Sequence, residues 1–285
     1  MRAIALSLAL AAFAAGVSAA DAPEGAKLRE RYQALQPQLQ HNAFGRPIHL
    51  DSEDKAQVMR GDVHAVLDQP YTKIREALSA RESWCEILVL PFNVKGCEAR
   101  GGDGLSLYIG RTYDTPIDKA TRIDFSFKAP ASSDDYLRLK LDAGNGPLGT
   151  KDYHIVFSAI PLDATHTFVH LSYGYTYGNW SKWAMQAYLA TSGAAKVGFS
   201  KDEQGHEVGG MRGVLERNTM RYFLAIDAYL DTLSTPPGTR EQRRIAAWFD
   251  ATEKYPKQLH EMSRSEYLAY KPRDYLPPRE RVAAH

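Results

Sequence analysis

The segment Val63–Leu90 constrains the fold of this chain more than any other. It contains an apolar run, a proline at Pro70, a short amphipathic stretch, a polar break and a second amphipathic stretch. This order is typical of a strand that leads into two short helices. Asp68 is a candidate N-cap, and Pro70 fits the first turn of a helix over Tyr71–Ala80. Ser83 is a candidate cap for the second helix, which the next proline would end.

The hundred residues that follow carry the period-two pattern of β-strands. In Thr121–Lys128 and Tyr136–Asp142, apolar side chains alternate with polar or charged ones, and Asp152–Pro161 and Thr165–Tyr177 continue the pattern. One apolar face per strand predicts an antiparallel sheet whose other face is wet. Further strands are expected at Pro47–Ser52, Gln57–Leu67, Leu105–Ile109 and Lys196–Ser200.

A long amphipathic helix is predicted at Gly210–Leu233. About 24 residues at 1.5 Å each span about 36 Å, enough to cross a sheet. The stripe expected to face the sheet is Met211, Leu215, Asn218, Tyr222, Ala225 and Tyr229. Other helices are expected at residues 24–40, with a break at Pro37, at Trp180–Thr191, and near Ile245–Phe249, Tyr255–Met262 and Ser265–Tyr270.

Residues 1–20 have the pattern of a secretory signal peptide. Arg2 is followed by the apolar run Ile4–Gly16 and by the small-residue pattern Val17-Ser18-Ala19. We expect cleavage after Ala19 or Ala20, and a periplasmic or secreted mature protein; an uncleaved anchor is the alternative. No later apolar run approaches the roughly 20 residues of a spanning helix, so no stable membrane span is expected.

The size and charge of the mature chain narrow the classes of partner. Removal of 20 of the 285 residues leaves one large domain or a domain with an extension. Without Arg2, the 34 remaining Lys and Arg residues balance 34 Asp and Glu residues. A neutral chain with mixed charges gives no electrostatic reason to expect nucleic acid as a partner.

Cys85 and Cys97 are the only cysteines of the chain. In an exported protein, two cysteines at this spacing favour a disulfide, here between the second helix and a strand that begins near Val94. Two buried free thiols are the alternative. Two cysteines without further close-spaced ligands do not indicate a metal site.

The strand–proline–helix segment, the strands to Tyr177 and the helix at Gly210–Leu233 resemble the START-like (polyketide cyclase, SRPBCC) helix-grip superfamily. The resemblance covers residues 46–234 and implies an α+β fold, in which a curved antiparallel sheet wraps around a long C-terminal helix with an apolar cavity. It further implies a lipid or another apolar ligand between sheet and helix, because superfamily members commonly hold such molecules. The helix at Trp180–Thr191 and the C-terminal helical extension 235–285 depart from the minimal plan. Residues 21–45 are expected to form a separate N-terminal helical segment.

The tyrosines of one strand face are the main candidates for ligand contact. Tyr173, Tyr175 and Tyr177 alternate along one strand, and buried tyrosine hydroxyls need hydrogen-bond partners. This suits the wall of a pocket for an amphipathic ligand; ordinary core or interface packing is the alternative. The full set of candidate ligand-binding residues is Phe125, Phe127, Leu139, Tyr173, Tyr175, Tyr177, Asn218 and Tyr222.

Other polar and aromatic residues have less specific interpretations. Arg217 and Arg221 are expected to be solvated, and Trp84 either lies at a pocket entrance or caps the core. His166 and His170 fall on the strand face opposite Val169 and the tyrosines. They are therefore expected to point to solvent, as is His154 on the preceding strand. Metal binding by these histidines is the alternative. No catalytic, phosphate-binding or dinucleotide motif is present, and no catalytic residue, metal or cofactor is assigned.

The sequence therefore predicts an exported binding protein for a lipid or another apolar or amphipathic small molecule. A cyclase- or hydrolase-type enzyme that uses the same cavity is one alternative. A cell-envelope interaction protein whose cleft is filled by its own side chains is the other.

Overall fold

The computed structural model describes residues 21–179 and 196–277. The predicted signal peptide and the predicted helix at Trp180–Thr191 lie outside the described residues. Among the described residues, no helix is both long enough and apolar enough to cross a bilayer.

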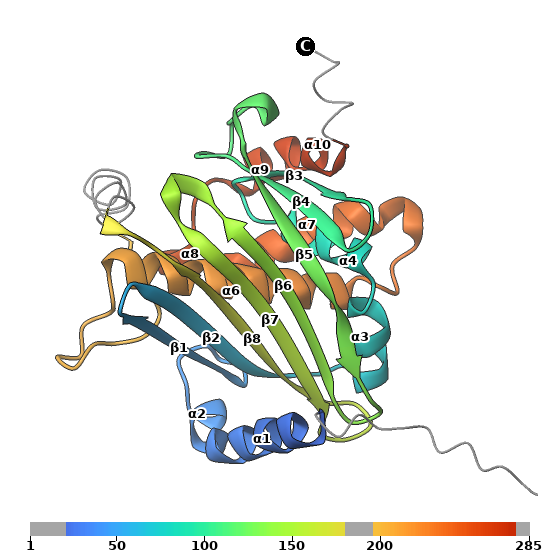
Figure 1. Ribbon diagram of the computed structural model, residues 1–285, viewed down its shortest axis with the longest axis vertical. Helices are drawn as coiled ribbons and strands as arrows, with labels where there is room; N and C mark the ends of the chain where they lie inside the picture. The colour runs from blue at the N-terminus through green and yellow to red at the C-terminus, as the bar shows by residue number, and fades with distance from the viewer. Residues whose placement is uncertain (1–20, 180–195, 278–285) are drawn as a thin grey trace, which may run out of the picture.

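One antiparallel sheet of eight strands organises the fold, in the order β1-β2-β8-β7-β6-β5-β4-β3. Figure 1 shows the sheet with α6 crossing behind it. The predicted α+β helix-grip architecture is confirmed. The strands are β1 (Ile48–Lys55), β2 (Val58–Leu67), β3 (Val94–Ala99), β4 (Gly104–Ile109), β5 (Thr121–Ser132), β6 (Leu137–Asn145), β7 (Lys151–Pro161) and β8 (Thr167–Thr176).

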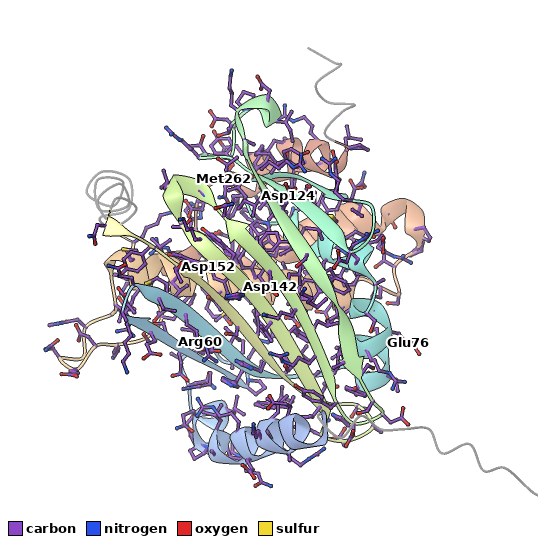
Figure 2. All side chains as sticks on the ribbon, viewed as in Figure 1. Arg60, Glu76, Asp124, Asp142, Asp152 and Met262 are labelled. Carbon is purple, nitrogen blue, oxygen red and sulfur yellow. A yellow bond between two sulfur atoms is a disulfide. The ribbon has the colours of Figure 1, made fainter. Side chains whose placement is uncertain are left out.

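The predicted phase of the strands is correct. In β6, buried Leu137, Leu139 and Leu141 alternate with half-buried Arg138 and Lys140. The inner faces of all eight strands contribute to one hydrophobic core, whereas charged residues such as Arg60, Asp124 and Asp142 project from the outer face (Figure 2). Because side chains alternate with a period of two, sequence periodicity alone determines which residues face inward.

The long helix α6 (Gly210–Asp231) packs across the inner face, over β1, β2 and β8. It approaches β2 most closely at Gly61, where a Cβ atom would lie 2.4 Å from Thr219 Oγ1 and 3.3 Å from the Leu215 side chain. Any other residue at this position would push the helix away from the sheet. The close packing of α6 on β2 therefore depends on glycine at position 61.

The two short helices after β2 form as predicted, but both predicted caps are wrong. Pro70 itself is the N-cap of α3 (Tyr71–Leu78), and Asp68 has a side chain 92% exposed. Helix α4 (Arg81–Leu88) begins two residues before Ser83, with Ala80 as its N-cap. Because Ser83 therefore lies inside the helix, its side chain is free to accept a hydrogen bond from Tyr229 across the core, at 2.9 Å.

The N-terminal helices α1 (Asp21–Ala34) and α2 (Gln36–Gln40) lie at the lower end of the sheet in Figure 1. The break between them comes at Leu35, and Pro37 lies in the first turn of α2 rather than ending a single helix. A small second core holds this segment against β7 and β8: Leu28, Leu35, Leu39, Tyr136, Ile160 and Phe168.

The C-terminal extension packs into the main core. Its helices are α7 (Pro237–Thr252), α8 (Pro256–Leu259), α9 (Arg264–Tyr270) and α10 (Pro272–Tyr275), so the short helix expected near Ile245–Phe249 is a 16-residue helix. Trp248 and Tyr267 are fully buried in the core. Lys271 Nζ donates to the carbonyl oxygens of Pro91 and Val94, both at 2.8 Å, which joins the extension to the edge of the sheet.

The strand predicted at Lys196–Ser200 does not form. A single isolated bridge between Lys201 and Glu207 closes a hairpin-like loop instead. Glu216 of α6, which is fully buried, accepts hydrogen bonds from the backbone N–H groups of Phe199 and Ser200 at 2.6 and 2.9 Å. The carboxylate of Glu216 therefore holds this segment in place. The pattern of apolar residues in the segment gave no sign of this contact.

Cys85 of α4 and Cys97 of β3 form a disulfide, with an S–S distance of 2.03 Å. The bond joins the second helix to the edge strand, as the sequence predicted.

We expect the double variant Cys85→Ala/Cys97→Ala to fold, because the main core does not depend on the bond. Its free energy of unfolding should fall by about 2–3 kcal/mol, the chain-entropy estimate for a short loop. Urea unfolding followed by circular dichroism measures this loss, and peptide mapping without reductant should show the linked pair. Free thiols at both positions in the exported protein would contradict the prediction.

Candidate functional site

Four tyrosines gather where the inner face of β7 and β8 meets α6, and we call them the tyrosine cluster. They are Tyr153 of β7, Tyr173 and Tyr175 of β8, and Tyr222 of α6. The ring centroids of Tyr153 and Tyr175 lie 5.2 Å apart in a stacked arrangement. Those of Tyr173 and Tyr222 also lie 5.2 Å apart, edge to face. The cluster joins two predicted tyrosines of β8 to the predicted Tyr222.

The hairpin register brings these rings together. Ile155 of β7 pairs with Tyr173 of β8, and an irregularity between Lys151 and His154 shifts the register at the end where Tyr153 lies. Gly146 in the preceding turn leaves room for the ring, since a Cβ there would lie 2.1 Å from a Tyr153 ring carbon. Tyr153 was missed as a site residue, although its place on the inward face of the adjacent strand was a usable signal.

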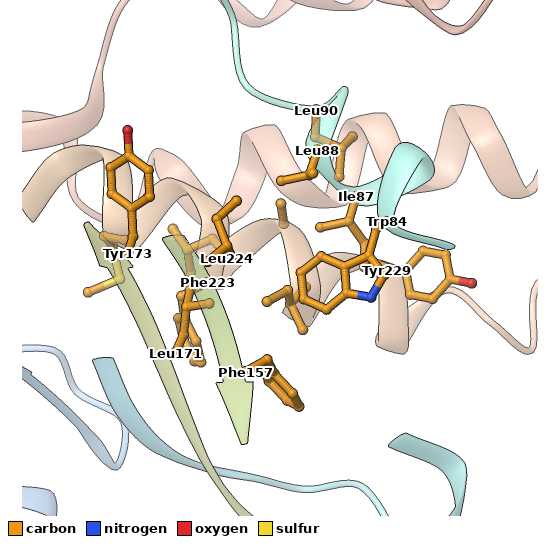
Figure 3. Packing of buried hydrophobic residues seen from close by; sticks show 14 of the residues in the cluster. Trp84, Ile87, Leu88, Leu90, Phe157, Leu171, Tyr173, Phe223, Leu224 and Tyr229 are labelled. Carbon is orange, nitrogen blue, oxygen red and sulfur yellow. The ribbon is translucent and has the colours of Figure 1, made fainter. Parts of the chain in front are cut away.

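The hydroxyl groups of the cluster differ in their partners. Tyr153 Oη lies 2.6 Å from Thr150 Oγ1. No hydrogen bond joins the hydroxyl of Tyr173, Tyr175 or Tyr222 to another described residue. Tyr173 and Tyr175 are 6% and 5% exposed as whole residues, and Tyr222 is half-buried. None of the three hydroxyl oxygens is among the fully buried polar atoms that lack a partner. Figure 3 shows Tyr173 at one end of the packed core, with its hydroxyl pointing away from Leu171 and Phe223.

Burial keeps these phenols protonated. It is the main cause that raises the pKa of Tyr173, Tyr175 and Tyr222 above the ordinary tyrosine value. Neighbouring tyrosines add to the rise at Tyr173, and Tyr153 together with Asp54 adds to it at Tyr175. The cluster therefore presents neutral hydroxyl donors over the whole physiological range.

Tyr177 and Asn218 make contacts of their own. Tyr177 lies just beyond β8, and its hydroxyl donates to Asp54 at 2.8 Å. Asn218 Oδ1 accepts from Arg221 Nη1 at 3.3 Å. Both groups lie near the end of the sheet that carries the cluster, and each has a protein partner.

The expectation that Arg217 and Arg221 are solvated is wrong. Arg217 is 5% exposed, and its Nη1 donates to the carbonyl of Val197. Arg221 Nη2 pairs with Glu261 at 2.5 Å. Helices of the C-terminal extension cover this side of α6, so a face that looked polar on the helical wheel is buried.

The other predicted ligand residues lie deep in the core. Phe125, Phe127 and Leu139 are 4%, 6% and 0% exposed. Trp84 is also a core residue: its ring meets Phe157 edge to face, and its Nε1 donates to the carbonyl of Leu78 at 2.9 Å (Figure 3). Contact between these residues and a ligand stays a prediction.

The predicted histidines lie on the outer face, but not all are solvated. His154 and His166 have side chains 51% and 43% exposed, each beside an aspartate. His170 is 17% exposed, contrary to expectation, because it stacks on buried His64 at 4.3 Å and pairs with Asp62 at 2.7 Å. The described residues contain no group of histidines, cysteines and carboxylates arranged to hold a metal ion.

A surface hollow of about 540 Å³ lies at the N-terminal end of α7 within the described residues. No predicted ligand-binding residue lines it. Its walls are Ser234, Thr235, Pro236, Thr239, Gln242, Arg243 and Ala246.

Comparison with known proteins finds solved structures of low similarity. No protein-family model matches the sequence, and no curated protein matches it significantly. Among solved structures, a conserved protein from Geobacillus kaustophilus is 14% identical, with a TM-score of 0.37, covering 60% of this chain and 95% of that chain. A START superfamily protein from Mycobacterium smegmatis is 16% identical, with a TM-score of 0.30, covering 50% and 90%.

A lipid-transfer protein is also among the similar structures. Human StAR-related lipid transfer protein 5 is 10% identical, with a TM-score of 0.30, covering 60% of this chain and 92% of that chain. The strand order and the position of α6 define a START-like helix-grip fold in this chain's own structure. Likenesses at these identities and TM-scores carry no conclusion about ligand or reaction.

Proposed function

We propose that the protein is an exported binding protein for an apolar or amphipathic small molecule, held between the sheet and α6. The observation that carries the proposal is the tyrosine cluster: four tyrosines gather at the margin of an apolar core, and the hydroxyls of three of them make no hydrogen bond to another described residue. The body of the ligand lies against apolar side chains, and its polar end lies at the cluster.

The cluster can supply both polar and apolar contacts to a ligand. Hydroxyls that make no hydrogen bond to the protein are available as donors. A ligand that accepts such hydrogen bonds gains about 0.5–1.5 kcal/mol from each. Its apolar part adds about 25 cal/mol for each Å² that leaves water.

Two features support export. Residues 1–20 have the pattern of a signal peptide, and the disulfide between Cys85 and Cys97 is typical of proteins that fold outside the cytoplasm. Cell fractionation with amino-terminal sequencing of the mature protein tests this part of the proposal; a full-length chain retained in the cytoplasm contradicts it.

Binding is tested with N-phenyl-1-naphthylamine, an uncharged probe whose fluorescence rises in apolar surroundings. Tyr175→Ala should change the affinity for the probe severalfold while the far-ultraviolet circular dichroism stays native. Ala225→Trp, on the buried stripe of α6, should weaken binding by filling the same space. Overpacking costs about 1–3 kcal/mol of stability, so the folded fraction is measured in parallel.

Tyr113→Ala is the matched control, because Tyr113 is 42% exposed and lies outside the cluster. It should leave probe binding unchanged. Unchanged binding in both folded test variants contradicts the proposed cavity and favours an interaction protein with a filled cleft. Native mass spectrometry of the mature protein should show a co-purified small molecule, and a change in the mass of that molecule on incubation would favour an enzyme.

A further inference from the structure

We infer that the site selects an uncharged ligand whose polar end carries hydrogen-bond acceptor oxygens, such as hydroxyl or carbonyl groups, over a ligand with a carboxylate or an ammonium group. This inference rests on the proposed function and assigns the ligand class of the same site. The geometry that carries it is the gathering of tyrosine rings from β7, β8 and α6, with centroids 5.2–6.2 Å apart.

The tyrosines of the cluster raise one another's pKa values. Tyr153, Tyr175 and Tyr222 all raise the pKa of Tyr173, and Tyr153 raises that of Tyr222, although burial is the larger cause in both. The ring centroid of Tyr173 lies 6.2 Å from that of Tyr153, 5.9 Å from that of Tyr175 and 5.2 Å from that of Tyr222, so the four rings gather in one small region. The site therefore offers several neutral donors to one small region, which matches an end group with more than one acceptor oxygen.

Among the described residues, the charged groups that affect the cluster provide no spare positive charge. The carboxylate of Asp54 in β1 raises the pKa of Tyr175, and it already accepts a hydrogen bond from Tyr177. Arg221 of α6 lowers the pKa of Tyr222, but its guanidinium is paired with Glu261 at 2.5 Å. A ligand carboxylate would lose its hydration there without gaining a free cation, which is costly in a buried site.

The arrangement of the rings disfavours an ammonium group. Cations bind over open aromatic faces. Here Tyr153 and Tyr175 stack on each other at 5.2 Å, and the edge contact between Tyr173 and Tyr222 has the same centroid distance. These contacts occupy one face in each pair, which leaves less open ring surface for an ammonium group.

The test uses the mature full-length protein with N-phenyl-1-naphthylamine bound, and three competitors with the same ten-carbon chain. These are monodecanoylglycerol, decanoate and decyltrimethylammonium, which differ in the charge of the polar end. We expect monodecanoylglycerol to displace the probe at a concentration at least tenfold lower than either charged compound. The order should hold from pH 6 to pH 9, because the phenols stay protonated.

Tyr173→Phe and Tyr175→Phe remove one hydroxyl each and keep the ring. Each should weaken monodecanoylglycerol binding by about threefold to tenfold, the range for one lost hydrogen bond. Tyr108→Phe is the matched control, because Tyr108 pairs with Arg100 on the outer face, and it should leave monodecanoylglycerol binding unchanged.

The outcomes separate this inference from the proposed function. No probe binding by the folded protein contradicts the proposed function, and the inference falls with it. Probe binding that decanoate or decyltrimethylammonium displaces at least as well as monodecanoylglycerol overturns the inference alone. Unchanged monodecanoylglycerol affinity in both folded phenylalanine variants overturns it as well.

Discussion

Replacing Leu139 with aspartate should prevent the protein from folding. Leu139 is 0% exposed in β6, a central strand, and its side chain belongs to the main core. An aspartate there would bury an unpaired charge and leave the space of the leucine partly empty. These two effects place the expected loss above about 4 kcal/mol, at the severe end of single substitutions. Expression as insoluble protein, or the absence of a cooperative thermal transition, measures it.

Substitutions on the outer face provide the controls. Lys140→Ala changes the residue next to Leu139 in sequence and removes only a surface ion pair with Asp142, so stability should change by less than about 0.5 kcal/mol. Phe125→Asp should match Leu139→Asp. Asp124→Ala should cost somewhat more than Lys140→Ala, because Asp124 accepts hydrogen bonds from Ser106 and Arg122. Equal effects on the two faces would show that the strand phase is wrong.

Lowering the pH from 7.5 to 4.5 should reduce the free energy of unfolding by about 2–3 kcal/mol through His64 alone. Burial is the first cause, and the neighbouring His170 the second, that lower the pKa of His64 to about 3. Its Nδ1 has no hydrogen-bond partner within the described residues. An unfolded chain takes up this proton near pH 6.5, whereas the folded protein does not, so stability falls as the pH drops below 6.5. Two pH units at about 1.4 kcal/mol each give the stated loss.

The titratable groups that face His64 come from four elements. Arg31 lies on α1, His49 on β1 and His170 on β8; all three lower its pKa, whereas Asp62 of β2 raises it. Asp62 itself has a pKa of about 2, so its contribution to stability is present above about pH 4 and lost only in stronger acid. Above pH 4.5, the large change in stability therefore comes from His64.

Urea unfolding of wild-type protein and of His64→Phe at both pH values tests this result. Phenylalanine keeps a flat ring between His170 and Phe168, so the variant should fold, and its stability should depend less on pH by the same 2–3 kcal/mol. His206→Gln, at a side chain 81% exposed, should behave as wild type. Equal acid losses in wild-type protein and His64→Phe would rule out His64 as the cause.

Most of the sheet could be predicted from the period-two alternation of apolar residues. The residues expected to face inward on β5, β6, β7 and β8 are buried, because alternation along a strand is a local property that packing does not alter. Within the described residues, the bounds of the long helix also agree closely, since polar and glycine-rich segments flank it. The capping residues Asp68 and Ser83 were wrong because helix starts shift by a residue or two when a proline and tertiary contacts compete with a local cap.

The candidate site was only partly visible in the sequence. Tyr173, Tyr175 and Tyr222 were recognised from their strand and helix faces. Tyr153 joins them only through the register of the β7–β8 hairpin and the room that Gly146 leaves. Arg217 and Arg221 were misjudged because a helical wheel shows one buried face, whereas α6 is buried against the sheet on one side and against the extension on the other.

The sequence by itself determined the alternation of the strands, the partner cysteines and the helix that crosses the sheet. Each of these depends on residues close together in the chain or on the only available pairing. The tertiary structure alone decided which tyrosines gather, which histidine is buried without a partner, and how Glu216 and Lys271 hold distant loops. Such contacts join residues far apart in the chain, and their energies depend on burial, which no local pattern of residues records.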